Sequence, residues 1–92
     1  MAYIIPSDIL ESISSFGFKL VANGSFEAGD TRTPDYLYRL VITNNGLYSC
    51  RYEIPHQHRK ESIFEGFRIQ TAQEMETIIK ACELLQFLRR SE

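Results

Sequence analysis

The segment from Tyr36 to Ile54 limits what this chain can fold into more than any other part of the sequence. Apolar and aromatic residues recur at every second position from Tyr36 to Thr43, and the same period returns from Leu47 to Ile54. Between these two runs, Asn44-Asn45-Gly46 supplies residue types that accept the positive φ angles of a tight hairpin turn. The segment therefore predicts a β-hairpin.

The two faces of this predicted hairpin differ in polarity. One face carries Tyr36, Tyr38, Leu40, Ile42, Tyr48, Cys50, Tyr52 and Ile54. The other face is more polar and carries Leu37, Arg39, Val41, Leu47, Ser49, Arg51 and Glu53. Because apolar side chains alternate toward the core along a half-buried strand, we expect the second face to point outward.

A short helix is predicted before the hairpin, from Ser7 to Phe16. Pro6 precedes it, Ser7 or Asp8 can cap its first turn with Glu11 completing a capping box, and Gly17 can end it in a left-handed conformation. Its apolar stripe consists of Ile9, Leu10, Ile13 and Phe16. From Phe18 to Glu27 the period becomes two, which predicts one long strand with a bulge at Gly24. The alternative is a hairpin that turns at Asn23-Gly24, and a polar loop from Gly29 to Asp35 follows.

After the hairpin, Pro55 stops the second strand and residues His56–Glu61 form a charged connection. A short, irregular fourth strand is predicted from Ile63 to Gln70, with a bulge at Gly66. Thr71 and Glu74 then match a capping box at the start of a terminal helix that is expected to reach about Arg90.

These elements predict an α+β fold in the order α-β-β-β-(β)-α. Both helices have an apolar stripe, so the economical architecture is a two-layer sandwich with the helices on one face of an antiparallel meander of three to four strands. Ninety-two residues are enough for a single domain, 1–92, with one core.

Composition and charge exclude several functional classes. Ten Lys and Arg residues against twelve Asp and Glu residues leave a formal net charge of −2, which argues against direct binding of nucleic acid through a cationic surface. No apolar run approaches the ~20 residues of a membrane span, and the amino terminus has no basic region typical of a secretory signal. Without a signal, the two cysteines are expected to stay reduced in the cytoplasm.

The cysteines and histidines do not predict a metal centre. Cys50, Cys82, His56 and His58 are the right ligand types for zinc, but the local spacing C-x5-H-x-H matches no standard zinc pattern. Both thiols fall on apolar stripes and are expected in the core. We find no nucleophile elbow, phosphate-cradling loop or zinc-protease motif, so no catalytic residue, metal ligand or cofactor is predicted.

The terminal helix is more apolar than a helix on one sheet face requires. Leu84 and Leu88 widen its stripe, and Phe87 falls among charged residues on the side that should face water. Exposed apolar clusters often mark interfaces. We therefore expect a small non-enzymatic protein-interaction module of bacterial or phage type, an inhibitor, adaptor or small subunit. Its anchor is either Leu84, Phe87 and Leu88 or the outward hairpin face with Arg39 and Arg51.

The expected partner is a larger protein, and the acidic balance of the chain favours a basic one such as a nucleic-acid-binding protein. Self-association through the terminal helix or an exposed strand edge is a further alternative. A function of a different class is RNA binding or ribonuclease activity. It would use His56 and His58 for proton transfer, and Arg59 and Lys60 for phosphate.

Overall fold

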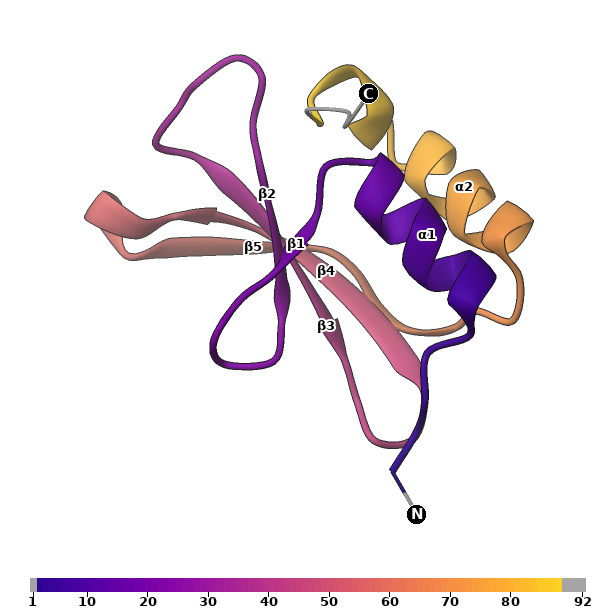
Figure 1. Ribbon diagram of the computed structural model, residues 1–92. Coiled ribbons are helices and arrows are strands. Elements are labelled where there is room, and N and C mark those ends of the chain that lie inside the picture. Colours follow the sequence, from indigo (N-terminus) through magenta and orange to yellow (C-terminus); the bar gives the residue numbers. More distant parts are fainter. Residues whose placement is uncertain (1, 89–92) are drawn as a thin grey trace.

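The computed structural model describes residues 2–88, which form two helices packed on one face of an antiparallel sheet (Figure 1). The sheet has five strands in the order β1-β2-β3-β4-β5, so every strand pairs with its neighbour in sequence. The predicted α+β class and the meander are confirmed, whereas three to four strands was too few. The strands are β1 (Lys19–Leu20), β2 (Phe26–Gly29), β3 (Leu37–Ile42), β4 (Leu47–Ile54) and β5 (Arg59–Arg68).

The central hairpin formed by β3 and β4 is confirmed. Its register places Leu40 opposite Cys50 and Arg39 opposite Arg51. Tyr38 and Leu40 are buried on one face, as are Tyr48 and Cys50 of β4, so the predicted inward face is correct. The side chains at Leu37, Arg39 and Val41 point to the opposite side of the sheet, because successive side chains alternate along a strand.

The long strand expected from Phe18 to Glu27 is wrong, and the hairpin alternative is correct. The chain turns at Asn23-Gly24, where the Val21 backbone N–H donates to the Ser25 carbonyl at 2.9 Å. Gly24 has a φ of +85°, and the Asn23 side chain accepts a hydrogen bond from the Ser25 backbone N–H. The local turn preference of Asn-Gly therefore outweighs the continuous period of two.

The fourth predicted strand is longer than expected and begins earlier. β5 starts at Arg59, so only the 3-10 turn η1 (Pro55–Gln57) and His58 separate it from β4. The bulge at Gly66 is confirmed, because Ser49 lies between the pairs Tyr48–Phe67 and Cys50–Phe64 and faces two residues of β5. The first half of this strand was not predicted because it is rich in charged residues. An edge strand can expose such side chains on both faces, so no alternation of apolar residues marks it.

The first helix, α1 (Ser7–Ser15), begins at Ser7 as predicted and ends one residue before Phe16, but its cap differs from the one expected. Pro6 is its N-cap and no side chain caps it, so the capping box expected from Ser7 or Asp8 with Glu11 is absent there. Asp8 instead accepts a hydrogen bond from the backbone N–H of Ala72, at the start of the second helix. Gly17 follows α1 with a φ of +96°, as the sequence predicts.

The second helix, α2 (Ala72–Ala81), begins as predicted but ends early. Thr71 caps it by accepting from the Glu74 backbone N–H at 3.1 Å. After Cys82 the chain turns at Glu83, whose φ is +58°, and continues as the 3-10 turn η2 (Leu84–Gln86). The long terminal helix is therefore wrong between Cys82 and Leu88. Its expected end at Arg90 lies outside the described residues.

The core lies between the helices and the inner sheet face. Ile9 and Ile13 of α1 and Met75 and Ile79 of α2 have no exposed surface, and they meet the buried side chains of the sheet in one cluster. Leu10 belongs to the predicted stripe of α1 but is 43% exposed, because α1 buries only about a third of its circumference.

Gly46 in the central hairpin turn lies against the ring of Tyr3, and this close approach can be tested. An added Cβ would lie 2.8 Å from the Tyr3 ring, and Gly46 has a φ of +80°. We expect Gly46→Ala to lower the free energy of unfolding by about 2 kcal/mol, from backbone strain and steric overlap together. Chemical denaturation measures this difference.

Gly24→Ala is the matched control for Gly46→Ala. Gly24 also has a positive φ, +85°, but an added Cβ would meet open space. Only the backbone term then remains, and the expected loss is about 1 kcal/mol. Equal losses at the two glycines would contradict a steric role for Tyr3.

Candidate interaction surface

The sheet face opposite the helices is the candidate functional surface, and we call it the outer sheet face. Neither α1 nor α2 covers it, since both lie on the other side of the sheet (Figure 1). The strand registers align Lys19, Glu27, Arg39, Arg51 and Ser62 in one row across all five strands. Two residues named by the sequence analysis, Arg39 and Arg51, therefore lie side by side at the middle of this face.

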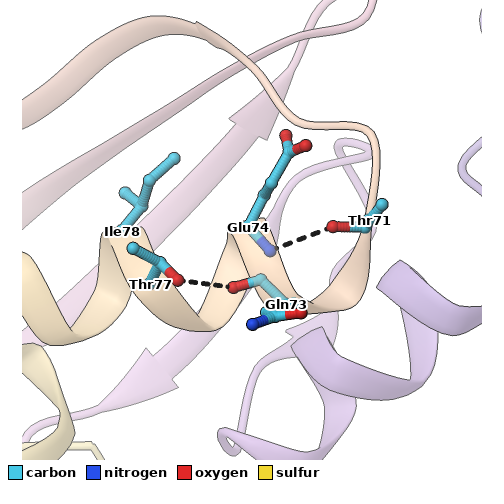
Figure 2. A pocket seen from close by; sticks show the side chains of 5 residues that line it. All are labelled: Thr71, Gln73, Glu74, Thr77 and Ile78. Carbon is cyan, nitrogen blue, oxygen red and sulfur yellow. Dashed lines mark hydrogen bonds between the residues drawn. The ribbon is translucent and has the colours of Figure 1, made fainter.

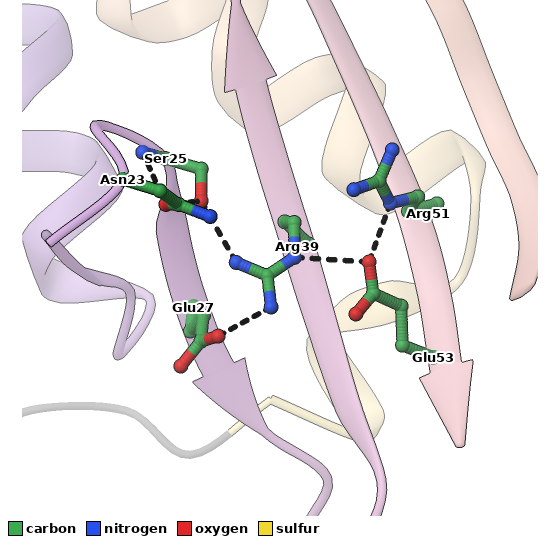
Figure 3. Close-up of polar contacts among 6 residues, drawn as sticks. All are labelled: Asn23, Ser25, Glu27, Arg39, Arg51 and Glu53. Carbon is green, nitrogen blue, oxygen red and sulfur yellow. Dashed lines mark hydrogen bonds and ion pairs between the residues drawn. The ribbon is translucent and has the colours of Figure 1, made fainter. Parts of the chain in front are cut away.

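A network of ion pairs holds these two arginines (Figure 3). Arg39 lies between two carboxylates: its Nη2 donates to Glu27, and its Nε donates to Glu53 Oε2 at 2.9 Å. Its Nη1 donates to Ser25 Oγ at 2.8 Å. The Nε of Arg51 donates to the same Glu53 oxygen. The guanidinium of Arg39 is thus held by partners on β2, on β4 and in the turn between β1 and β2.

The network explains how two like charges can sit directly opposite each other in a sheet. Arginines in register repel, so nearby carboxylates are needed. Burial alone would raise the pKa of Glu53, but hydrogen bonds from Arg39 and Arg51 outweigh burial and lower it. Hydrogen bonding to Glu53 is likewise the main cause that raises the pKa of Arg39.

Sequence reasoning named the two arginines but missed Ser25, Glu27 and Glu53 as their partners. The signal that could have found Glu53 was its place on the outward face of the predicted hairpin. Glu53 was predicted on the same face as Arg39 and two positions after Arg51, and the observed register sets those two arginines opposite each other. Glu27 and Ser25 could not be found in this way, because their placement depends on the β1–β2 turn.

A shallow hollow of about 450 Å³ lies beside the network on the outer sheet face. Val41 and Leu47 give it an apolar part, and Ser49 and Ser62 add hydroxyl groups. Arg39, Arg51 and Glu65 border it, and the bulge of β5 at Gly66 forms another part of its wall. The hollow therefore combines apolar surface with an edge that carries two arginines and one glutamate, and Arg39 is already paired with Glu27 and Glu53.

The second predicted anchor lies in a different environment from the one expected. Leu84 and Leu88 are each only 3% exposed and belong to the core, so they are not on the surface. Phe87 is half-buried, and the guanidinium of Arg32 stacks over its ring at 3.8 Å from the centroid. The turn at Glu83 is the physical reason, because it folds the chain back and buries residues that a continuous helix would expose.

Beside Phe87, the loop around the buried Asp30 carboxylate bonds the segment 87–88 to the sheet. Asp30 has no exposed surface and accepts hydrogen bonds from the backbone N–H, Nε and Nη2 of Arg32 and from the Tyr38 hydroxyl. The Thr31 backbone N–H donates to the Phe87 carbonyl at 2.7 Å, and Asp30 forms a β-bridge with Leu88. A small pocket of about 270 Å³ adjoins this cluster. From its sequence, this loop was predicted only to be polar.

The residues proposed for RNA chemistry lie at the end of the β4–β5 hairpin. His56, His58, Arg59 and Lys60 are all exposed. The ring of His56 stacks on that of Tyr36, with the centroids 6.2 Å apart. Arg59 pairs with Glu61 at 2.9 Å. With these contacts, the loop is explained as the exposed end of a hairpin and needs no catalytic role.

The two cysteines are not joined to each other. Cys50 is buried, and burial raises the pKa of its thiol to about 12. Cys82 is half-buried, and burial raises its pKa as well. Among residues 2–88, no three His, Cys, Asp or Glu side chains are grouped so that they could hold a metal ion.

A further groove follows the first turns of α2 (Figure 2). Its polar groups serve the helix itself, because Thr71 accepts from the Glu74 backbone N–H and the Thr77 hydroxyl donates to the Gln73 carbonyl. We therefore assign it no binding role.

Comparison with known proteins gives no relative from which a function could be inferred. A scan against protein-family models and searches of curated proteins and of solved structures found no match. In the part of the chain that the structure describes, neither helix has the length and apolar content needed to cross a membrane.

Proposed function

We propose that this protein is a non-enzymatic interaction module that binds a larger protein through its outer sheet face. The observation that supports this proposal is the hollow beside Arg51, where apolar surface and a charged guanidinium adjoin on a face that neither helix covers. Interfaces combine such apolar patches with arginine.

Of the two anchors expected from the sequence, we propose the outer sheet face and not the segment from Leu84 to Leu88. Leu84 and Leu88 already contribute to the core, so they offer a partner no surface. Val41 and Leu47 are half-buried within the sheet and line the same hollow as Arg51. A partner that covers them removes apolar area from water at about 25 cal/mol per Å².

The RNA-directed alternative has weaker support. The positive charge of Arg59 is partly neutralised by Glu61, and His56 already packs on an aromatic ring. We therefore propose the interaction module alone, and the double variant His56→Ala/His58→Ala is expected to leave partner binding unchanged.

Site-specific photo-crosslinking in the native host tests the proposed function. A photoreactive benzophenone amino acid at Val41 should give one discrete adduct, and Arg51→Gln in the same molecule should reduce its yield at least about fivefold. The matched position is Glu76, which is exposed on α2. The proposal fails if Val41 gives no adduct or the same adducts as Glu76. The thermal midpoint of Arg51→Gln must remain close to that of the wild type.

A further inference from the structure

The charges of this molecule are distributed unevenly between its two layers. The helices carry four acidic residues and one basic residue, all of them exposed: Asp8, Glu11, Glu74, Glu76 and Lys80. The outer sheet face has five basic and three acidic residues: Lys19, Arg39, Arg51, Lys60, Arg68, Glu27, Glu53 and Glu65. The net charge of −2 therefore conceals a sheet face with an excess of positive charge.

The two central arginines have different capacities to bind a partner. Arg39 uses all three of its nitrogens within the chain, and its side chain is 13% exposed. Arg51 uses only Nε, and its side chain is 41% exposed. Among residues 2–88, its Nη1 and Nη2 have no hydrogen-bond partner. These two nitrogens can bind a carboxylate, since the guanidinium fork matches its geometry.

The position of Arg51 beside the hollow adds a second requirement for the partner. Val41 and Leu47 line the same hollow, so a group that fills it is apolar where it meets them. The Ser62 hydroxyl can bind backbone groups of an entering chain, and Ser49, whose Oγ already accepts from the Gly66 backbone N–H, can still donate its own O–H.

From these observations, and resting on the function proposed above, we infer that the partner presents an acidic segment to the outer sheet face. A carboxylate of that segment binds Arg51, and a neighbouring aliphatic side chain occupies the hollow beside Val41 and Leu47. The acidic helices repel such a segment, which orients it toward the sheet. This assignment differs from the basic partner that the net charge of the chain suggests.

Two synthetic peptides of opposite charge test this inference by NMR titration of the full chain. The acidic probe is acetyl-GELELG-amide and the basic probe is acetyl-GKLKLG-amide. Only the acidic probe should shift the Nε–H signal of Arg51 and the backbone amides of Val41 and Leu47. The shifts should weaken as salt is raised, because the charges involved are partly exposed.

Two variants, each of which removes one positive charge, show whether the peptide binds at Arg51 or responds only to the total charge of the face. Arg51→Gln should weaken binding of the acidic probe at least about fivefold, whereas Lys60→Gln, on the same face but outside the hollow, should weaken it less than about twofold. Equal effects of the two variants, or equal binding of both probes, would overturn the inference. Tighter binding of a single-stranded RNA 12-mer at the same amides would also overturn it.

The photo-crosslinking experiment separates this inference from the proposed function. If the partner segment captured at Val41 contains no Asp or Glu, the outer sheet face remains the interface and the acidic-segment inference fails. If Val41 captures no partner, both fail together.

Discussion

Asp30→Ala is expected to lower the free energy of unfolding by about 3 kcal/mol at pH 7, because it removes four hydrogen bonds from a fully buried carboxylate. Tyr38 is 2% exposed, so its hydroxyl would be left buried without its acceptor. The loss stays below that of a fully buried ion pair, since Arg32 is half-exposed and water can solvate it. Urea denaturation of wild type and variant measures the difference.

Asp35→Ala is the matched control in the same loop. Asp35 is exposed, so the expected change is within about 0.5 kcal/mol. If Asp30→Ala costs less than about 1 kcal/mol, the cluster around Asp30 contributes little to the packing of the chain end.

The same carboxylate makes stability depend on pH in acid. Burial alone would raise the pKa of Asp30, but hydrogen bonds from Arg32 and Tyr38 outweigh it and hold the pKa below its usual value. The group therefore contributes stability above its unfolded pKa of about 3.9, and this contribution is lost as the pH falls through the lower folded pKa. Asp30→Asn cannot titrate, so its stability should fall less steeply below about pH 4.

Leu84→Ala is expected to cost about 3 kcal/mol of unfolding free energy, because it opens a cavity in the core. Leu84 is 3% exposed and packs with the buried residues of the helices and sheet. The result also discriminates between the two anchors considered for a partner. If Leu84 were a surface anchor, the Leu84→Ala protein would lose partner binding and keep its stability. If Leu84 belongs to the core, the variant protein loses stability.

Leu20→Ala makes the same chemical change at an exposed position on the edge strand β1. Leu20 is 67% exposed, so the expected loss is below about 0.5 kcal/mol. Similar losses for Leu20→Ala and Leu84→Ala would contradict the burial of the turn η2.

Elements that depend on neighbouring residues were predicted well from the sequence. The β3–β4 hairpin follows from alternation on both sides of Asn44-Asn45-Gly46, and its inward face follows from where the apolar residues fall. The cap at Thr71 was also correct, since it depends on a pattern of four residues, although the Glu74 carboxylate accepts from the Gln70 backbone N–H and not from that of Thr71. These features were accessible because short-range sterics and hydrogen bonding determine them.

Candidate site residues were only partly accessible. Arg39 and Arg51 could be placed on the outer sheet face from the sequence. The sequence could not predict that Arg39 is fully paired within the chain whereas Arg51 is paired through one nitrogen. Arg39 is saturated by Glu27 of β2, a contact that depends on how Phe18–Gly29 divides into two strands. The capacity of Arg51 to bind a partner is visible only once these contacts are known.

The sequence by itself determined the α+β class, the central hairpin, the start of α2 and the polarity of the outer sheet face. Tertiary structure alone decided where α2 ends, because no breaker stands at Glu83, whose φ is +58°. Burial of Leu84 and Leu88, with Asp30 and Thr31 bonded to the chain end, offsets the strain of that turn. Those partners lie more than fifty residues away, and no local pattern can contain a contact between segments so far apart.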